Sequence, residues 1–141
     1  MLKILIPVDG SSHAERAVNQ VLDLAASGAA LEIFLLNVQL PIASGHARMF
    51  VTQDDVDAYH REEGLAALAG ARALLEAAGM PYSHHIAVGR VAETIVRFAR
   101  ERGADKIVMG THGRGGLLEV LMGSVAREVL RDSSVPVLLV K

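Results

Sequence analysis

The sequence predicts an α/β fold in which an open parallel sheet is covered by helices on both faces. Five short apolar runs alternate with four segments whose apolar residues recur at helical spacing. The strand-like runs are continuously apolar, as is typical of parallel strands buried on both faces. No internal repeat or linker divides the 141 residues, so we expect one domain over residues 1–141.

Each element follows from a local pattern of residues. The predicted strands are Lys3–Val8, Leu31–Val38, Tyr82–Val88, Asp105–Met109 and Val135–Val140. The predicted helices run from Ser12 to Gly28, from Asp54 to Ala78, from Val91 to Arg102 and from Ser124 to Arg131. The spacing of Ser12 and Glu15 indicates a capping box. The buried face of the second helix is expected to carry Leu65, Leu68, Ala69, Leu75 and Ala78. The aperiodic segment Leu40–Thr52 is expected to be a loop.

A glycine-rich segment follows the fourth strand. It reads Gly110-Thr111-His112-Gly113-Arg114-Gly115-Gly116 and continues to Gly123-Ser124, with the spacing G-x2-G-x9-G-S. Glycines permit positive φ and close approach of the backbone to a ligand. Gly123-Ser124 stands where a helix begins, and the N–H groups of a helix start attract anions. The segment therefore predicts a phosphate-binding loop.

Three separate segments converge on that loop in a parallel sheet. Asp9, Val38 and Gly110 each lie at the carboxyl end of a predicted strand. Ligands of open α/β sheets bind beyond these ends, where the strand order reverses. We therefore expect one crevice lined by all three.

Composition and motif chemistry exclude several classes of function. The net charge of −2 gives no electrostatic footprint for nucleic acid. The loop lacks the lysine of a Walker A motif, and Asp-Gly-Ser-Ser after the first strand does not match the dinucleotide fingerprint. No signal peptide, membrane span or cysteine is seen, which predicts a cytoplasmic protein. His84 and His85 are adjacent on a strand and point to opposite faces, so they cannot share a metal ion.

The chain resembles the universal stress protein family along its whole length. The features that carry the resemblance are Ile4 to Ser11 (Ile-Leu-Ile-Pro-Val-Asp-Gly-Ser), Gly89 to Ile95, Asp105 to Arg114, Gly123 to Ala126 and Val135 to Val140. Because the ATP-binding members carry the G-x2-G-x9-G-(S/T) signature, the resemblance implies that this chain binds ATP, with Mg²⁺ carried on the phosphates. It also implies the strand order 3-2-1-4-5 and a homodimer formed through the last strand, Val135 to Val140.

The resemblance further implies which residues contact the nucleotide. They are Pro7, Val8, Asp9, Val38, Gly110, Thr111, Gly113, Arg114, Gly123, Ser124 and Val125. Asp9 is expected to face the nucleoside, and the backbone of Val38 to read the adenine edge. Arg114 is either a phosphate ligand or a solvated loop cation, and its guanidinium suits bidentate contact with phosphate.

The residues favour a nucleotide-dependent stress-response or signalling module over an enzyme. Hydrolysis needs a group that positions the nucleophile at the γ-phosphate. His112 stands between loop residues with nothing in the sequence to orient it, and Asp9 is expected at the nucleoside end. The His-x-Gly-His signature of adenylyl transferases is missing as well. We therefore expect ATP binding with little or slow turnover, and the alternative is an ATPase or a nucleotidyl transferase of the same α/β group.

Overall fold

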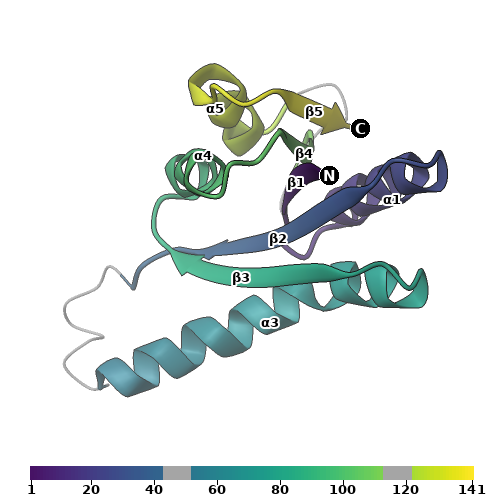
Figure 1. The fold of residues 1–141 in the computed structure, drawn as a ribbon. Coiled ribbons are helices and arrows are strands. Elements are labelled where there is room, and N and C mark those ends of the chain that lie inside the picture. Colours follow the sequence, from purple (N-terminus) through teal and green to yellow (C-terminus); the bar gives the residue numbers. More distant parts are fainter. Residues whose placement is uncertain (43–51, 113–121) are drawn as a thin grey trace.

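The fold is a five-stranded, all-parallel sheet with the strand order β3-β2-β1-β4-β5 (Figure 1). We describe residues 1–42, 52–112 and 122–141 of a computed structural model. The strands are β1 (Leu2–Pro7), β2 (Leu31–Gln39), β3 (Tyr82–Val88), β4 (Lys106–Gly110) and β5 (Val137–Val140). The helices are α1 (Ser12–Ala26), α3 (Gln53–Ala77), α4 (Val91–Glu101) and α5 (Ser124–Asp132). The fold class and the strand order expected from the sequence are both confirmed.

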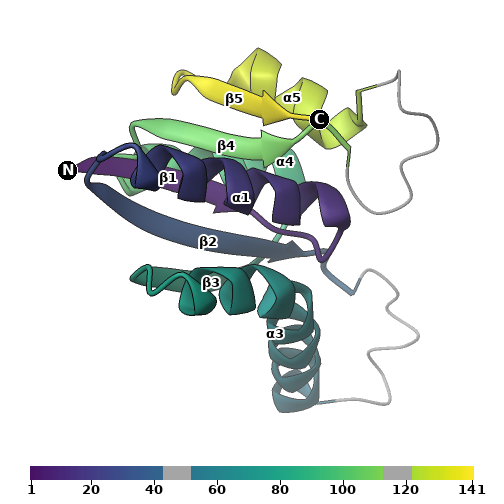
Figure 2. The ribbon, with the colours of Figure 1, turned by 90° about the vertical axis from the view of Figure 1, so that its right-hand side faces the viewer.

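Helices cover both faces of the sheet, and each face has its own apolar core. α1 and α3 lie on one face, and α4 and α5 lie on the other (Figures 1 and 2). Alternate residues of β1 divide between the two cores: Ile4 and Ile6 pack toward α1 and α3, and Leu5 packs toward α4 and α5. Because both faces are buried, the central strands contain continuous apolar runs, Ile4–Ile6 in β1, Ile33–Leu36 in β2 and Ile107–Met109 in β4, as their sequence predicted.

The first helix begins one residue away from its expected cap. Ser11 is the N-cap of α1, and its hydroxyl accepts a hydrogen bond from the Ala14 N–H at 3.3 Å. Ser12 is already helical, so the predicted capping box between Ser12 and Glu15 is wrong. The chain contains two adjacent serines, and the turn at Asp9 selects the first of them as the cap.

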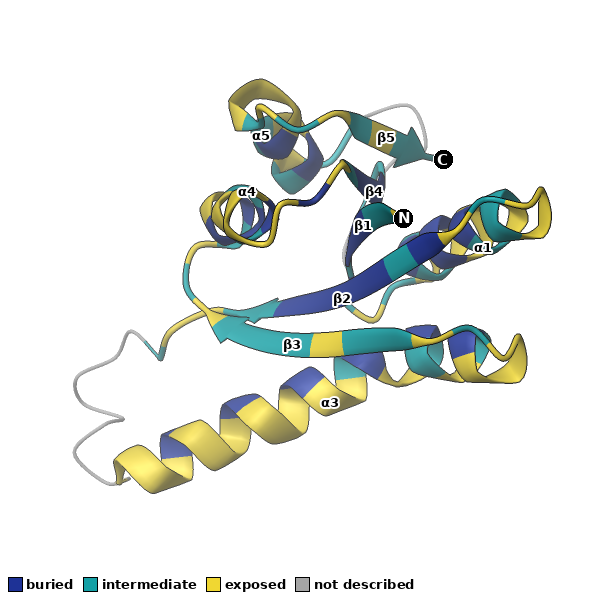
Figure 3. Cartoon of the chain, viewed as in Figure 1, coloured by how far each residue is buried: buried dark blue, intermediate teal, exposed yellow. Residues whose placement is uncertain are grey.

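The long helix α3 buries only part of the expected face: Leu68 and Leu75 are buried, as predicted. Its buried residues are Val56, His60, Gly64, Leu68, Ala71 and Leu75, which form a dark stripe on an otherwise exposed helix (Figure 3). Leu65, Ala69 and Ala78 are exposed, so their predicted burial is wrong. The reason is close packing at Gly64, where an added Cβ would lie 2.7 Å from the Cδ1 atom of Ile86. This contact with β3 fixes the rotation of the helix, and a glycine carries no apolar signal.

The last strand is shorter than predicted. The Ser133 hydroxyl accepts from the Val135 N–H at 3.0 Å and donates to the Val135 carbonyl at 2.7 Å, which holds Val135 in a turn. β5 therefore starts at Val137.

None of the helices in the described part of the chain has the length and apolar character of a membrane span.

Candidate functional site

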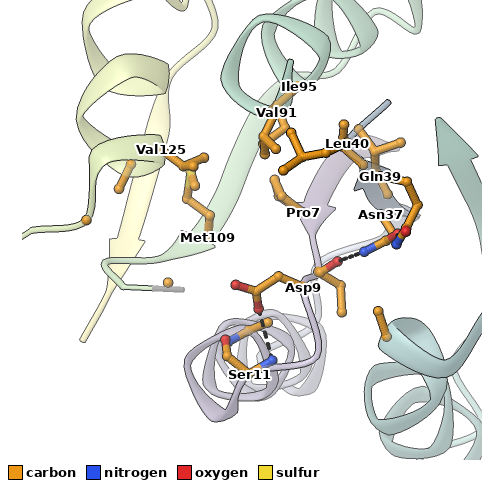
Figure 4. A pocket seen from close by; sticks show the side chains of 18 of the residues that line it. Pro7, Asp9, Ser11, Asn37, Gln39, Leu40, Val91, Ile95, Met109 and Val125 are labelled. Atoms are coloured by element: carbon orange, nitrogen blue, oxygen red, sulfur yellow. Dashed lines mark hydrogen bonds between the residues drawn. The ribbon is translucent and has the colours of Figure 1, made fainter. Parts of the chain in front are cut away.

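The carboxyl ends of β1, β2 and β4 open onto one cavity of about 770 Å³ (Figure 4). This volume lies within the roughly 300–1,000 Å³ of small-molecule sites. The cavity brings together every described residue expected at the site, namely Pro7, Val8, Asp9, Val38, Gly110, Thr111, Gly123, Ser124 and Val125. Gly113 and Arg114 lie outside the described residues. The predicted crevice is therefore present at the expected edge of the sheet.

One part of the cavity, here called the α5 end, is formed by Gly110, Thr111 and the start of α5. The Gly123 N–H donates to the Thr111 carbonyl at 2.7 Å, which ties the start of α5 to the end of β4. Gly123 is the N-cap of α5, and no side chain caps this helix in the described part of the chain. Ser124, Val125 and the buried Ala126 line the cavity. The uncapped first turn thus presents N–H groups and the positive end of the helix dipole to a ligand.

The glycines at the α5 end act differently from the prediction. Neither Gly110 nor Gly123 has a positive φ, and Gly123 has φ −65°. At Gly110 an added Cβ would lie 2.7 Å from the Cβ atom of His13 and 3.0 Å from the His13 carbonyl carbon and oxygen. Gly110 is therefore needed so that β4 can pass close to the start of α1, rather than for an unusual backbone conformation.

The opposite part of the cavity, here called the β1–β2 end, is formed by Val8, Asp9 and residues 37–39. The Val8 N–H donates to the Leu36 carbonyl at 2.8 Å, after which the chain leaves the sheet. Asp9 accepts a hydrogen bond from the Ser11 N–H through Oδ1 at 2.9 Å (Figure 4). The carboxylate of Asp9 is thus held at the N-terminus of α1 and beside the cavity.

Sequence reasoning missed Asn37, which is buried at the β1–β2 end. Its side chain is 3% exposed, and its Nδ2 atom donates to the Val8 carbonyl at 2.8 Å. Its Oδ1 atom accepts from Gln39 Nε2 at 2.7 Å. An amide that satisfies both of its polar ends in a buried strand is costly to remove. A polar residue inside the apolar run Leu31–Val38 was the available signal.

Sequence reasoning also missed the side walls of the cavity. The walls are apolar where α4 and β4 meet it and mixed where α3 meets it; the lining residues include Leu40, Val91, Ile95, Met109, Tyr59, Glu63 and Ala67. Tyr59, Glu63 and Ala67 follow one another at i, i+4 and i+8 on α3. That spacing is visible in the sequence, but it is equally typical of a solvated helix face.

His112 is oriented, contrary to the sequence-based expectation. Its Nδ1 atom lies 2.9 Å from the Thr111 hydroxyl, and its ring lies 5.3 Å from that of His13 between centroids. Its Nε2 atom is buried and has no hydrogen-bond partner among the described residues. The prediction that nothing orients this ring is therefore wrong, because the contact from α1 depends on the tertiary fold.

The remaining histidines occupy separate places. His84 is exposed on β3, whereas His85 turns inward and its ring lies 5.0 Å from that of Phe98, so the two do point to opposite faces. Burial, with smaller contributions from Arg102 and His84, lowers the pKa of His85 below its ordinary value. His60 is buried, and its Nε2 lies 3.1 Å from the Leu40 carbonyl oxygen. Within residues 1–42, 52–112 and 122–141, no three His, Asp or Glu side chains gather as a metal-binding group.

The sequence and fold match characterised proteins across the chain. The family model for the universal stress protein family matches residues 1–141. Universal stress protein MJ0577 of Methanocaldococcus jannaschii is 32% identical over 99% of this chain and 94% of its own length. A solved structure of MJ0577 superposes with a TM-score of 0.83 at 34% identity, covering 99% of this chain and 95% of that one.

Two further solved structures contain a nucleotide. A universal stress protein in complex with cAMP is 27% identical, with a TM-score of 0.73 over 99% of this chain and 97% of its own. The universal stress protein from Archaeoglobus fulgidus in complex with dAMP is 26% identical, with a TM-score of 0.66 over 100% of this chain and 98% of its own. With the sheet order, the cavity at its carboxyl edge and the match over every residue taken together, this chain belongs to the universal stress protein family.

Proposed function

We propose that the chain binds adenine nucleotides, with ATP as the physiological ligand, and that it works as a nucleotide-dependent stress-response module. The observation that carries the proposal is the cavity whose α5 end offers an uncapped helix N-terminus and whose β1–β2 end offers a carboxylate. Phosphates suit the first and a nucleoside suits the second. The complexes of two relatives with cAMP and dAMP support this choice of ligand.

The residues fit a triphosphate in this orientation. At the α5 end, the first-turn N–H groups and the hydroxyls of Thr111 and Ser124 would hold the phosphates, together with Gly113 and Arg114. At the β1–β2 end, Asp9 would accept from a ribose hydroxyl or from the adenine amino group, and Pro7, Val8 and Val38 would enclose the nucleoside. Mg²⁺ would be carried on the phosphates, because it binds through substrate oxygens and water more often than in an all-protein cage.

The proposal is tested by identifying the ligand of the purified protein. Mass spectrometry of material released on denaturation should find an adenine nucleotide, and calorimetry of the emptied protein should show ATP binding. Absence of adenine nucleotide together with no binding at millimolar ATP would overturn the proposal. Because a module need not turn over its ligand, we expect hydrolysis well below about 1 per second, the low end of ordinary enzymes.

A second candidate, an ATPase or nucleotidyl transferase, is favoured by one observation. His112 lines the cavity and its Nδ1 atom lies within hydrogen-bonding distance of the Thr111 hydroxyl, so the ring has an orienting partner beside the ligand space. Turnover above about 1 per second that is lost in His112→Gln, with ATP affinity retained, would favour this enzyme over the binding module.

We also propose that the chain forms a homodimer through β5. This strand lies at the edge of the sheet, and Leu138 is 46% exposed on it. An uncovered apolar edge strand invites pairing with another chain. Leu138→Asp should shift the protein toward monomer in sedimentation velocity, whereas Leu130→Asp on α5, where the leucine is 49% exposed, should leave the dimer intact. A dimer that survives Leu138→Asp would remove β5 from the interface.

A further inference from the structure

The most informative local feature outside the expected site residues is the way Asn37 replaces one backbone hydrogen bond of the sheet. β1 and β2 pair in parallel up to Pro7 and Leu36, and the Val8 N–H still donates to the Leu36 carbonyl. In a regular parallel ladder the next bond would run from the Val38 N–H to the Val8 carbonyl. Instead, the Val8 carbonyl accepts from the Asn37 side chain at 2.8 Å (Figure 4).

The consequence is that the Val38 peptide is left facing the cavity. The backbone N–H and C=O of one residue point to the same neighbouring strand, and those of the next residue point to the other neighbour. The N–H and C=O of Val38 therefore point to the side of β1, as those of Leu36 do. The peptide of Gln39 faces the other way, and its carbonyl accepts from the Gly89 N–H at 2.9 Å. In the part of the chain that the structure describes, the Val38 N–H donates to no backbone or side-chain group on the β1 side. Since Val38 lines the cavity, this N–H is available to a ligand.

The orientation of the Asn37 amide is determined by its surroundings. The Val8 carbonyl can only accept, so Nδ2 must face it, and Oδ1 then faces Gln39 Nε2 at 2.7 Å. At 3% exposure, Asn37 is largely shielded from water as an alternative partner. Gln39 therefore locks Asn37 from one side, and Val8 locks it from the other.

We infer that Asn37 is a positioning residue for base recognition: by occupying the Val8 carbonyl, it releases the Val38 N–H, which together with the C=O of the same residue forms a donor and acceptor pair for the edge of a nucleobase. Such a pair complements adenine, which offers a ring nitrogen acceptor beside an amino donor. A base with a keto group at that position would place its oxygen against the Val38 carbonyl. The inference rests on the proposed nucleotide function and adds to it the residue that makes the base-reading edge.

Amide hydrogen exchange of the protein without nucleotide tests the first step. In an NMR experiment on the wild-type chain, the Val38 amide should exchange far faster than the Leu36 amide, and addition of AMP should protect it. In Asn37→Ala the Val38 N–H can donate to the vacated Val8 carbonyl, so the Val38 amide should become protected without AMP. A wild-type Val38 amide that is as protected as Leu36 before AMP is added would overturn the inference.

Ligand affinity tests the second step and separates positioning from general stability. Asn37→Ala should weaken AMP binding about tenfold, the effect of about one hydrogen bond, with no change in affinity for inorganic tripolyphosphate. Ile33→Val, a buried substitution on the same strand, serves as the matched control and should lower stability without changing either affinity. Equal losses for AMP and tripolyphosphate in Asn37→Ala would show a merely structural role.

The failure of this inference can be told from the failure of the proposed function. If the wild-type chain binds no adenine nucleotide at millimolar concentration, the proposed function falls and the role of Asn37 in base recognition falls with it. If the wild-type chain binds AMP but Asn37→Ala binds it equally well, only the role of Asn37 falls. Should Asn37→Ala fail to fold, Asn37→Ser keeps a smaller polar side chain that cannot span the distance to Val8, and the same predictions apply to it.

Discussion

At the α5 end of the cavity most of the groups offered to a ligand are backbone N–H groups, whereas at the β1–β2 end the groups offered are held in place by side chains. The α5 end depends on the N-terminus of a helix and on Gly110, which lets β4 pass close to the start of α1. The β1–β2 end depends on Asp9, anchored to Ser11, and on Asn37, anchored to Val8. A site built from backbone groups tolerates the loss of a side chain but not an added side chain that fills its space. A site built from side chains loses its function when one of those side chains is removed. Substitutions at the two ends should therefore fail in different ways.

The largest effect is expected from Gly123→Val at the α5 end. The φ of −65° at this N-cap is accessible to valine, so the fold should survive with a loss of no more than about 1 kcal/mol. Since Gly123 lines the cavity, we expect the added carbons to enter the space in front of the first-turn N–H groups. Loss of two or more hydrogen bonds to phosphate, at about 1.5–3 kcal/mol each, should weaken ATP binding by ~100-fold or more in calorimetry.

Gly79→Val is the matched control for that experiment. Gly79 has φ +66° and follows α3, away from the cavity lining. Forcing valine into the left-handed region should cost about 1–2 kcal/mol of stability, with ATP affinity unchanged. Gly123→Val should therefore lower ATP affinity with little loss of stability, and Gly79→Val should lower stability with no loss of ATP affinity. Unchanged ATP affinity in Gly123→Val would contradict the assignment of phosphate to the α5 end.

An intermediate effect is expected when the two ends are compared by single side chains. Asp9→Ala should weaken AMP and ATP binding by the same factor, about ten- to hundredfold, because a carboxylate hydrogen bond contributes about 1.5–3 kcal/mol and both ligands share the nucleoside. Ser124→Ala should weaken ATP binding by about three- to tenfold and leave adenosine binding unchanged. Titrations with ATP, AMP and adenosine measure both ratios. A loss confined to ATP in Asp9→Ala would mean that the nucleotide lies in the opposite direction.

The contrast between the two ends also explains what the sequence could reveal. The α5 end was predictable because its glycines, serine and helix start are neighbours along the chain, in a spacing that can be read directly. The role of Asn37 was not predictable, because its partner Val8 lies 29 residues away and the contact exists only in the folded sheet. The same limit applied to His112, whose orientation depends in part on His13.

The fold was predicted more completely than the site because its signals are local and repeated. Continuous apolar runs marked the strands, and Gly28 and Gly79 marked the ends of α1 and α3 to within two residues. The buried face of α3 was predicted at Leu68 and Leu75 but missed at Gly64, which packs against Ile86 and has no apolar side chain to mark the contact in the sequence. A contact that depends on a missing side chain, or on a partner far away in the sequence, can be recognised only in the structure.

The smallest expected effect comes from His85, which changes the stability of the fold without touching either end of the cavity. The pKa of His85 is lowered from its ordinary 6.5 in the folded chain, mainly by burial. As the pH falls below 6.5, the unfolded chain therefore takes up the proton first, and the free energy of unfolding decreases until folded His85 is protonated as well. Urea denaturation at pH 7.5 and at pH 5.5 should show this decrease in the wild type, and His85→Gln should show a smaller one.

His84→Gln, at the exposed neighbouring position, is the control: because His84 contributes less than burial to the lowered pKa of His85, this variant should change the pH dependence much less than His85→Gln does. The difference between His85→Gln and the wild type isolates His85 from the carboxylates, which titrate at lower pH in both proteins. AMP affinity should be the same in the wild type and His85→Gln at pH 7.5, because the His85 ring packs between Phe34 and Phe98 and not against the cavity. A loss of AMP affinity in His85→Gln would show that the β1–β2 end is coupled to the packing of β3, and that its side-chain anchors do not act alone.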